Sequence, residues 1–258
     1  MLIAFIIIMI LLGLFGYYLI ENNINESYNL KYDFIKNYTY SYDIKDDRIV
    51  GDNIYEMCAS VDMLVANYTS DYIDYIYGVN LLNNTTIFTM NISPKGDLIY
   101  VPSENKYLLD LQLELPNMIV YPETIIEYGD TWSSDICSNG TFLTDGRAFE
   151  YSIIGIKNYT CLGKEKIIIN KIGYDCVNIG MISDYSVNIS EKNTSNSTIV
   201  IGHVLGNYWV NKDSGILIKS DRLINQITTM NMPNENNMGI FTETEIDDHI
   251  ITELKNIY

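Results

Sequence analysis

The sequence predicts a mainly β protein, with one antiparallel sheet that follows an N-terminal transmembrane helix. Three observations predict this fold class. Residues 1–20 are almost wholly apolar. Beyond residue 21 the chain consists of short runs rich in Tyr, Ile, Val and Thr, separated by turn residues. Helical periodicity is scarce there, and we therefore expect one β domain of ordinary globular composition within the 258 residues.

The first twenty residues, MLIAFIIIMILLGLFGYYLI, predict a membrane anchor. They include no charged side chain, and about twenty helical residues rising ~1.5 Å each span a hydrocarbon core of about 30 Å. A cleaved signal peptide, the main alternative, would have a basic start, a shorter apolar stretch and a small-residue cleavage site, which this segment lacks. A buried core helix is the other alternative. We expect a transmembrane anchor at 1–20, a polar neck at 21–27 and an extracytoplasmic β domain at 28–258.

The charge of the chain excludes some classes of partner. The formal net charge is −17, and all of it lies beyond the apolar segment. A surface of that sign repels phosphate backbones and anionic lipid headgroups. We therefore expect no nucleic acid partner, and contact with a membrane only through the N-terminal helix.

The orientation of the domain is predicted from N-glycosylation patterns, because no basic residue flanks the anchor. The pattern Asn-x-Ser/Thr occurs eleven times, which favours a chain exposed on the far side of the membrane. Asn91 is a poor acceptor because Pro94 follows its serine. An Asn-rich composition is the alternative explanation. The remaining candidates are Asn25, Asn37, Asn67, Asn83, Asn84, Asn139, Asn158, Asn188, Asn193 and Asn196.

The four cysteines also lie beyond the anchor. Cys58, Cys137, Cys161 and Cys176 are even in number, which is compatible with two disulfides in an oxidising compartment. Three pairings remain open, and a Cys161–Cys176 disulfide is favoured because both residues flank an apolar run in neighbouring strands. Without a Cys-x-x-Cys pair, the spacing does not predict a zinc site.

Turn residues predict four hairpins. Residues 93–96, Ser-Pro-Lys-Gly, and 212–215, Lys-Asp-Ser-Gly, each end in a glycine that can take a positive φ. Further reversals are expected at 171–173 and 233–237. Between them, alternating tyrosines such as Tyr40 and Tyr42 place their rings on one face of a strand, where we expect core rather than a carbohydrate-stacking surface.

Three segments together resemble a known family. LPNMIVYPETIIEYGDTWSS at 115–134 ends a Pro-bounded strand in Gly-Asp-Thr-Trp; YTCLGKEKIIINKIGYDCVNIG at 159–180 has a Gly-Tyr-x-Cys element; GNYWVNKDSGILIKSDRL at 206–223 is a hairpin with a tryptophan. This order resembles poorly characterised prokaryotic cell-surface proteins, archaeal ones among them, whose domain is similar to the half-barrel of outer-membrane lipoprotein carriers.

The resemblance implies one strongly curved antiparallel sheet, a half-barrel or open barrel, with an apolar concave face. It implies structural roles rather than catalytic ones for four residues. Gly129 and Asp130 would form a turn, Trp132 would pack against the sheet, and Trp209 belongs to the hairpin. An anchored chain departs from the released carriers, which leaves a tethered role in binding an apolar ligand.

No residue pattern predicts catalysis, a metal or a cofactor. His203 and His249 stand in no motif, and Asp247 and Asp248 on one strand would point to opposite faces. Nucleotide-binding, hydrolase, zinc and EF-hand patterns are missing from the sequence. Only a carboxylate pair assembled by folding could support glycosidic chemistry.

The sequence thus predicts a membrane-tethered, non-enzymatic cell-surface domain outside the cytoplasm. It would bind a partner protein, a glycan or an apolar ligand. The alternatives are a lipid- or hydrophobe-binding half-barrel of the lipoprotein-carrier type and a purely structural envelope component.

Overall fold

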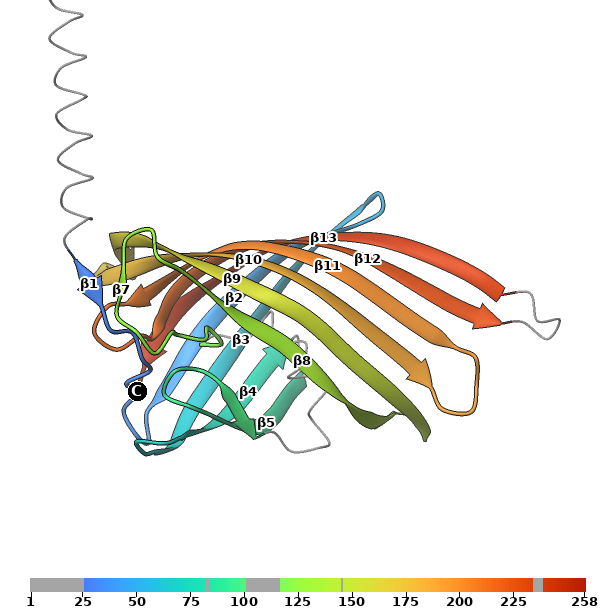
Figure 1. The fold of residues 1–258 in the computed structure, drawn as a ribbon, viewed down its shortest axis with the longest axis horizontal. Helices are drawn as coiled ribbons and strands as arrows, with labels where there is room; N and C mark the ends of the chain where they lie inside the picture. Colours follow the sequence, from blue (N-terminus) through green and yellow to red (C-terminus); the bar gives the residue numbers. More distant parts are fainter. Residues whose placement is uncertain (1–25, 82–83, 101–116, 145, 234–238) are drawn as a thin grey trace, which may run out of the picture.

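The structure, a computed structural model, describes residues 26–81, 84–100, 117–144, 146–233 and 239–258. Its main feature is one eleven-stranded antiparallel sheet that curls strongly into a half-barrel (Figure 1). The predicted β class and curved sheet are therefore confirmed for these residues. The predicted anchor at 1–20 and most of the neck lie outside them. Within the described ranges, no helix is long and apolar enough to cross a membrane.

Thirteen strands are described. The N-terminal half of the chain supplies β1 (Ser27–Tyr28), β2 (Thr39–Val50), β3 (Asn53–Tyr68), β4 (Ile73–Leu81), β5 (Asn84–Ile92) and β6 (Leu98–Tyr100). The C-terminal half supplies β7 (Ile126–Glu127), β8 (Thr131–Thr144), β9 (Arg147–Ile169), β10 (Ile172–Glu191), β11 (Ser197–Asn211), β12 (Leu217–Pro233) and β13 (Gly239–Ile257). The short strands β1 and β7 pair with each other in a separate sheet.

The large sheet consists of two meanders joined in the middle. Its order is β6-β5-β4-β3-β2-β13-β12-β11-β10-β9-β8, so every strand pairs with its neighbour in sequence except at β2 and β13. These two strands pair over the register Val50–Ile246 to Tyr40–Ile257. Backbone hydrogen bonds from Thr39 N to Tyr258 O (2.6 Å) and back from Tyr258 N to Thr39 O (3.0 Å) continue the ladder.

Three of the predicted hairpins are described, between β5 and β6, β9 and β10, and β11 and β12. The turn expected at 171–173 lies one residue earlier, at Asn170 and Lys171, and Gly173 belongs to β10. Asn170 (φ 50°) and Lys171 (φ 68°) both have positive φ, which is the geometry of a two-residue hairpin whose twist matches that of its strands. The turn expected at 233–237 falls mostly on residues that are not described.

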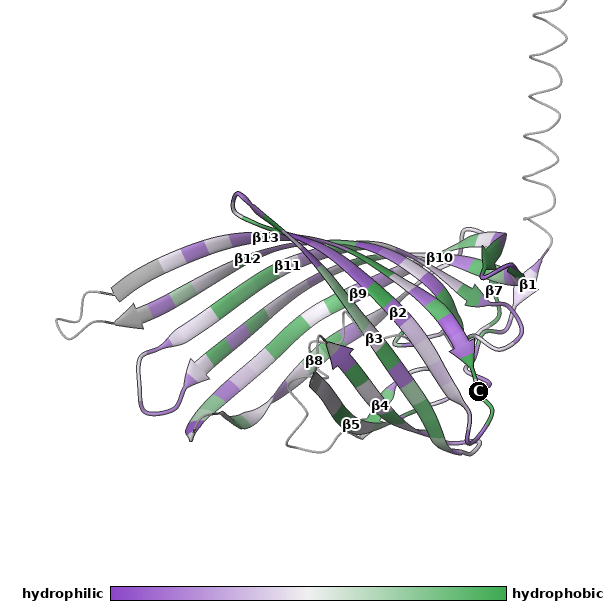
Figure 2. Cartoon of the chain, turned by 180° about the vertical axis from the view of Figure 1, so that it is seen from behind, coloured by the Kyte–Doolittle hydropathy of each residue, from purple (hydrophilic) through white to green (hydrophobic). Residues whose placement is uncertain are grey.

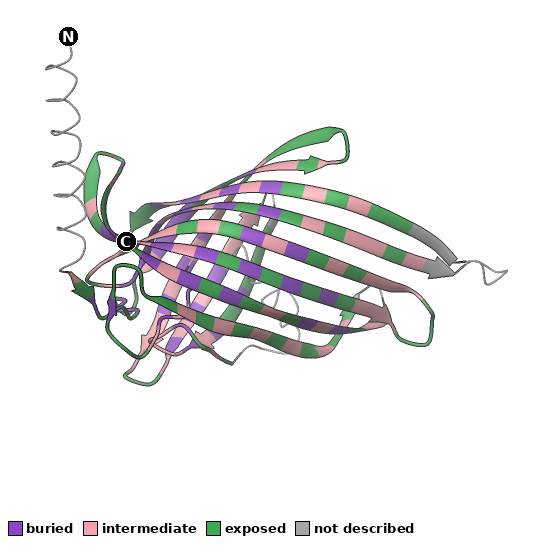
Figure 3. Ribbon diagram, turned by 45° about the horizontal axis from the view of Figure 1, so that its top comes forward, coloured by how far each residue is buried: buried purple, intermediate pink, exposed green. Residues whose placement is uncertain are grey.

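Buried and exposed side chains alternate along the strands (Figure 3). In β9, Tyr151, Ile153 and Tyr159 are buried, whereas Ile154 and Ile156 are exposed. Because successive side chains point to opposite faces, each strand has one row inside the curve and one row outside it. Hydropathy follows the same alternation less strictly (Figure 2), since several inward positions are polar and several outward positions are apolar.

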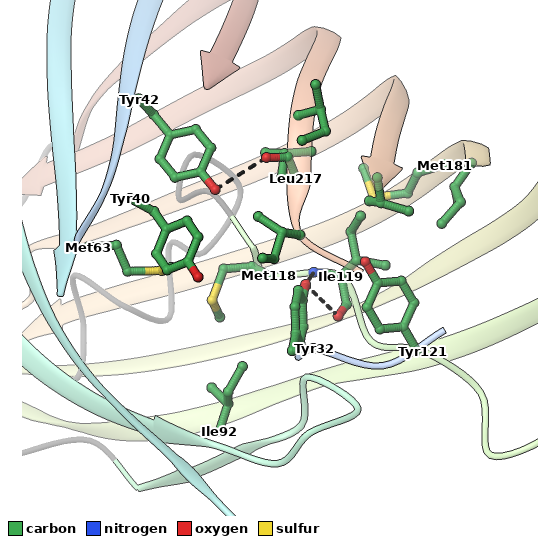
Figure 4. Close-up of a cluster of buried hydrophobic side chains, with 14 of the residues drawn as sticks. Tyr32, Tyr40, Tyr42, Met63, Ile92, Met118, Ile119, Tyr121, Met181 and Leu217 are labelled. Atoms are coloured by element: carbon green, nitrogen blue, oxygen red, sulfur yellow. Dashed lines mark hydrogen bonds between the residues drawn. The ribbon is translucent and has the colours of Figure 1, made fainter. Parts of the chain in front are cut away.

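Two segments, residues 28–34 and 117–121, pack against the concave face, and we call them the plug. The fully buried Tyr32 hydroxyl donates to Ile119 O (3.1 Å) and accepts from Ile119 N (3.0 Å). The Tyr121 hydroxyl donates to Gly215 O (2.6 Å), and the Tyr42 hydroxyl donates to Leu217 O (3.2 Å) (Figure 4). A buried hydroxyl without a partner would cost about 1–3 kcal/mol. The plug is held to the sheet by the Tyr121 bond and by the Asn117 side chain, which donates to the Tyr42 hydroxyl (2.7 Å) and accepts from Leu217 N (2.7 Å).

The tyrosine-rich strands supply the core, as expected. Tyr40, Tyr42, Tyr75 and Tyr77 are each at most 1% exposed, while Tyr38 lies at the surface. Burial raises the pKa of Tyr75 and Tyr77 well above the ordinary value. Neighbouring rings meet edge to face, for example Tyr75 and Tyr77 with centroids 5.7 Å apart, an arrangement that stabilises aromatic pairs.

Glycines on the concave face allow the sheet to curve under large side chains. A Cβ at Gly155 would lie 2.6 Å from the carbonyl oxygen of Asp184 and 2.9 Å from Tyr185 Cβ. A Cβ at Gly202 would lie 2.1 Å from Tyr185 Cζ. The Tyr185 ring thus lies over Gly202 on β11, and its backbone approaches Gly155 on β9, so a side chain would fit at neither glycine. Glycines at such positions are typical of strongly bent sheets.

We predict that Gly155→Ala lowers the free energy of unfolding by about 1–3 kcal/mol, because the added methyl meets backbone atoms that cannot move aside. Denaturant unfolding would measure the loss. Gly78→Ala in β4 is the matched control, since its Cβ would meet only Asp62 O at 3.9 Å. That variant should keep or slightly gain stability. Equal effects of the two substitutions would contradict this role of Gly155.

Candidate functional site

Three of the four motif residues expected to be structural lie where the plug meets β8. Gly129 has φ +88°, and the Asp130 carboxylate accepts a hydrogen bond from Glu127 N (2.9 Å), so both residues lie in the turn between β7 and β8. Trp132 donates through Nε1 to Val120 O (2.8 Å) and stacks on Tyr159 with ring centroids 5.3 Å apart. Its ring ties the edge strand to the plug.

Trp209 lies at a bulge in β11, where the register with β12 shifts between Trp209 and Val210. Its Nε1 donates to Glu165 Oε2 (2.6 Å) on β9. This bond crosses over β10, which lies between the two strands in the sheet. Trp209 therefore braces three strands.

All four cysteines are free thiols in the structure. Cys161 lies opposite Ile179, and Cys176 lies opposite Glu165. Cys176 is therefore three positions along β10 from Ile179, the residue opposite Cys161. At ~3.3 Å per residue this offset is about 10 Å, whereas the two Cα atoms of a disulfide lie within about 7 Å of each other. The favoured Cys161–Cys176 disulfide does not fit this register. Burial raises the pKa of the Cys176 thiol to about 12, so it is an inert core residue.

The sequons fall in three kinds of place. Asn37 and Asn193 are exposed in turns with positive φ. Asn67 and Asn196 donate their side-chain amides to Tyr72 (3.3 Å) and Glu191 (2.7 Å) respectively. The three on the convex strands are Asn139, Asn158 and Asn188, all exposed. Asn25 and Asn83 lie outside the described residues, as does the side chain of Asn84.

The two histidines pair with carboxylates on the convex face. His203 Nδ1 lies 2.7 Å from Asp184 Oδ1, and His249 Nε2 lies 2.9 Å from Asp221 Oδ1. Both imidazoles are partly exposed on an open surface. In the part of the chain that the structure describes, no group of three or more His, Cys, Asp or Glu could hold a metal ion.

The concave face has a group of buried polar side chains that the sequence did not reveal. Lys157 on β9 lies directly opposite Ser183 on β10, and Arg222 projects from β12 on the same face. They are 6%, 0% and 2% exposed. We call these three residues the cation cluster. Burial, and after it the guanidinium of Arg222, lower the pKa of Lys157 to about 8.

A second charged group lies beside the cation cluster on the same face. Arg48 Nε and Nη2 donate to the two carboxylate oxygens of Asp248 at 2.7 and 3.1 Å, and Nη2 lies 3.2 Å from Asp46 Oδ2. Arg48 thus holds both carboxylates. Among the described residues, none of the ion pairs includes Lys157 or Arg222.

The convex face has an unusual number of exposed aliphatic side chains. Ile182, Leu205 and Leu223 lie side by side across β10, β11 and β12. A parallel row two residues further along each strand contains His203 and Asp184, and a further row contains more isoleucines. We call the aliphatic members, each 37–65% exposed, the convex patch: Ile154, Ile156, Ile182, Ile201, Leu205, Leu223 and Ile227.

Sequence reasoning missed both the cation cluster and the convex patch. A signal for the first is the run 151–159, in which Lys157 holds an inward position of the alternation between Ile153 and Tyr159. The signal for the second is that β10 to β12 have aliphatic residues at inward-facing and at outward-facing positions. Neither signal can be used until it is known which alternate residues of each strand face inward.

Comparison with known proteins does not identify the chain. No family model matches it, and no curated protein matches it. Among solved structures, it is similar to the hypothetical lipoprotein YmcC from Escherichia coli, with 12% identity over 84% of each chain and a TM-score of 0.29. It is also similar to a protein from Parabacteroides distasonis described as a lipoprotein, with 10% identity over 89% of this chain and 100% of the other, and a TM-score of 0.32. Both organisms are bacterial, so the archaeal part of the expected resemblance finds no support, and TM-scores this low carry no argument about function.

The lowered pKa of Lys157 predicts a change of stability with pH. Below pH 8 the lysine is charged in both the folded and the unfolded protein, so the free energy that its burial costs does not change with pH. Above pH 8 the folded state loses its proton before the unfolded state does, so stability rises with pH. Between pH 8 and 9 this group should add about 1 kcal/mol to the free energy of unfolding.

Denaturant unfolding of the wild type and of Lys157→Met across pH 7–9 would measure this contribution as the difference between the two curves. The buried thiols of Cys161 and Cys176 act in the opposite direction near pH 9 because their pKa values are raised, but they are common to both proteins. Parallel curves would contradict a buried, protonated Lys157.

Proposed function

We propose that this chain is a non-enzymatic, membrane-tethered domain that binds a partner protein through the convex patch. The observation that supports this best is the exposure of seven large aliphatic side chains on one face of β9 to β12. Exposed aliphatic side chains gathered on one face of a soluble domain, with polar residues around them, are typical of protein interaction sites. The central His203–Asp184 pair and the polar edges give the face the composition of a protein interface.

The shape and chemistry of the convex patch favour a protein over the other expected ligands. A glycan is held by aromatic platforms and converging hydrogen bonds, and the patch is aliphatic. A small apolar ligand needs a concave site that encloses it, whereas the concave face at the plug end is filled by side chains such as Tyr32 and Tyr121. A lipid-carrier role and a purely structural role are therefore the weaker alternatives.

The charge beside the convex patch defines the partner further. On its β13 side the convex face presents Glu245, Asp247 and Glu253, and Asn225 donates its amide to Asp247 (2.6 Å). The net charge of −17 has the same sign. A partner with an apolar centre and a rim of Lys and Arg would be attracted and correctly oriented.

The tether and the outward orientation are parts of this proposal that rest on the sequence. The length and apolarity of residues 1–20 support the anchor. The exposed sequons support the orientation. The cysteines do not, because the structure holds them as free thiols.

Site-directed photo-crosslinking in native membranes tests the partner site. A photoreactive residue at Leu205 or Leu223 should give one discrete protein adduct, and the same residue at Ile54 in β3, which is 73% exposed, should give none. Ile201→Glu in the same chain should weaken the adduct at position 205 at least tenfold, because one desolvated charge costs about 2 kcal/mol or more at an interface. Lipid or glycan adducts alone, or equal adducts at all three positions, would refute a protein partner.

Glycan mapping tests the orientation. We predict glycans on Asn37 and Asn193, whose amides are exposed in turns, and none on Asn67 or Asn196, whose amide nitrogens are occupied by hydrogen bonds. Mass spectrometry of peptides from the protein isolated from its native membranes would show which are modified. Unmodified Asn37 and Asn193 would remove the main support for an extracytoplasmic domain.

A further inference from the structure

We propose that the cation cluster on the concave face binds an oxyanion, a phosphate or carboxylate group that is either free or part of a lipid headgroup. This site is separate from the convex patch and would be occupied by a different ligand. The cluster consists of Lys157, Ser183 and Arg222, which reach the inside of the half-barrel from β9, β10 and β12.

Each of the three side chains has at least one donor without a hydrogen-bond partner among the described residues. Ser183 Oγ is buried and makes no hydrogen bond, and the same is true of Arg222 Nε. Arg222 Nη2 makes one long contact, 3.4 Å to Thr252 Oγ1, and the Tyr208 hydroxyl lies beside the guanidinium. No hydrogen bond of Lys157 is found among the described residues. Buried polar groups are satisfied in the great majority of native structures, so these unpaired donors indicate a ligand.

The charge of the cluster is only partly compensated. Lys157 and Arg222 are close enough for each cation to disfavour the other, and among the described residues neither forms an ion pair with a carboxylate. On the same face Asp46 and Asp248 share Arg48, so that group has a net charge of −1, and the two groups together keep one positive charge. Buried cations without a full counter-charge are unfavourable in the empty protein, and a bound anion would relieve both the repulsion and the loss of solvation.

The types of residue define the chemistry of the ligand. An arginine, a lysine and a hydroxyl are the donors that bind phosphate and carboxylate groups, and their bonds to an ionised oxygen are about twice as strong as bonds between neutral groups. Gly206 makes room for this arrangement, because Arg222 Cγ lies 2.9 Å from where a Cβ of Gly206 would be. The stem of Arg222 therefore lies over β11 at Gly206, and its guanidinium lies beside the Tyr208 hydroxyl on the same strand.

Thermal unfolding of the full chain in a non-ionic detergent tests the site. Inorganic phosphate is compared with chloride at equal ionic strength, and short-chain phosphatidic acid with diacylglycerol of the same chains. We expect one phosphate-bearing probe to raise the Tm by several degrees over its matched control. A response to inorganic phosphate identifies a free anion as sufficient, and a response to phosphatidic acid alone identifies a lipid headgroup.

Variants separate binding from folding. Lys157→Met should leave the Tm without ligand unchanged or higher, because it removes an uncompensated buried charge, and it should abolish the response to the phosphate-bearing probe. Ser183→Ala removes only the hydroxyl group, so it should not disturb the packing, but it should reduce that response. Lys166→Met, at an exposed lysine on the same strand, is the matched control and should keep it.

Two results would overturn the proposal. One is a wild-type protein whose Tm responds to neither phosphate-bearing probe beyond the matched controls. The other is a Lys157→Met protein that responds as the wild type does. Neither result bears on the convex patch, whose crosslinking experiment is independent of the concave face.

Discussion

The pairing of β2 with β13 is the interaction on which the rest of the structure depends. It joins two meanders, β2 to β6 and β8 to β13, and no other pair of described strands connects them in the large sheet. Without this ladder each meander would expose a long edge of unpaired backbone groups. With it, eleven strands share one curvature, and the concave face becomes a single surface that the plug can fill.

Curvature then decides which side chains are buried and with what partners. A strongly bent sheet converges on its concave side, so large residues there must lie flat over glycines or reach backbone carbonyls. Tyr185 over Gly202 is an example of the first, and Tyr121 bonded to Gly215 O is an example of the second. The same convergence brings Lys157 and Arg222 together from strands that are three apart in the sheet. On the convex side the strands diverge, and aliphatic residues such as Leu205 remain exposed.

Local features of this fold could be predicted from the sequence, and global ones could not. Alternation and turn residues are short-range signals, so the β class, the hairpin at 212–215 and the burial of Tyr40 and Tyr42 could be predicted. The β2–β13 pairing joins residues about two hundred positions apart and leaves no local pattern. The curvature was implied only by a family resemblance. The prediction of a Cys161–Cys176 disulfide does not fit the structure, because a disulfide depends on the register between two strands. That register cannot be predicted from the composition of the strands.

The central position of β13 has a consequence for how the protein is made. β2 is synthesised near the beginning of the chain, but its partner follows only after almost all the other strands, a delay on the order of ten seconds or longer at ordinary translation rates. Until then the edge of β2 that β13 will cover stays open, and the two meanders cannot share a core. The chain is thus held in an unfinished state throughout synthesis. Such a state depends on protection from aggregation until β13 is available to pair with β2.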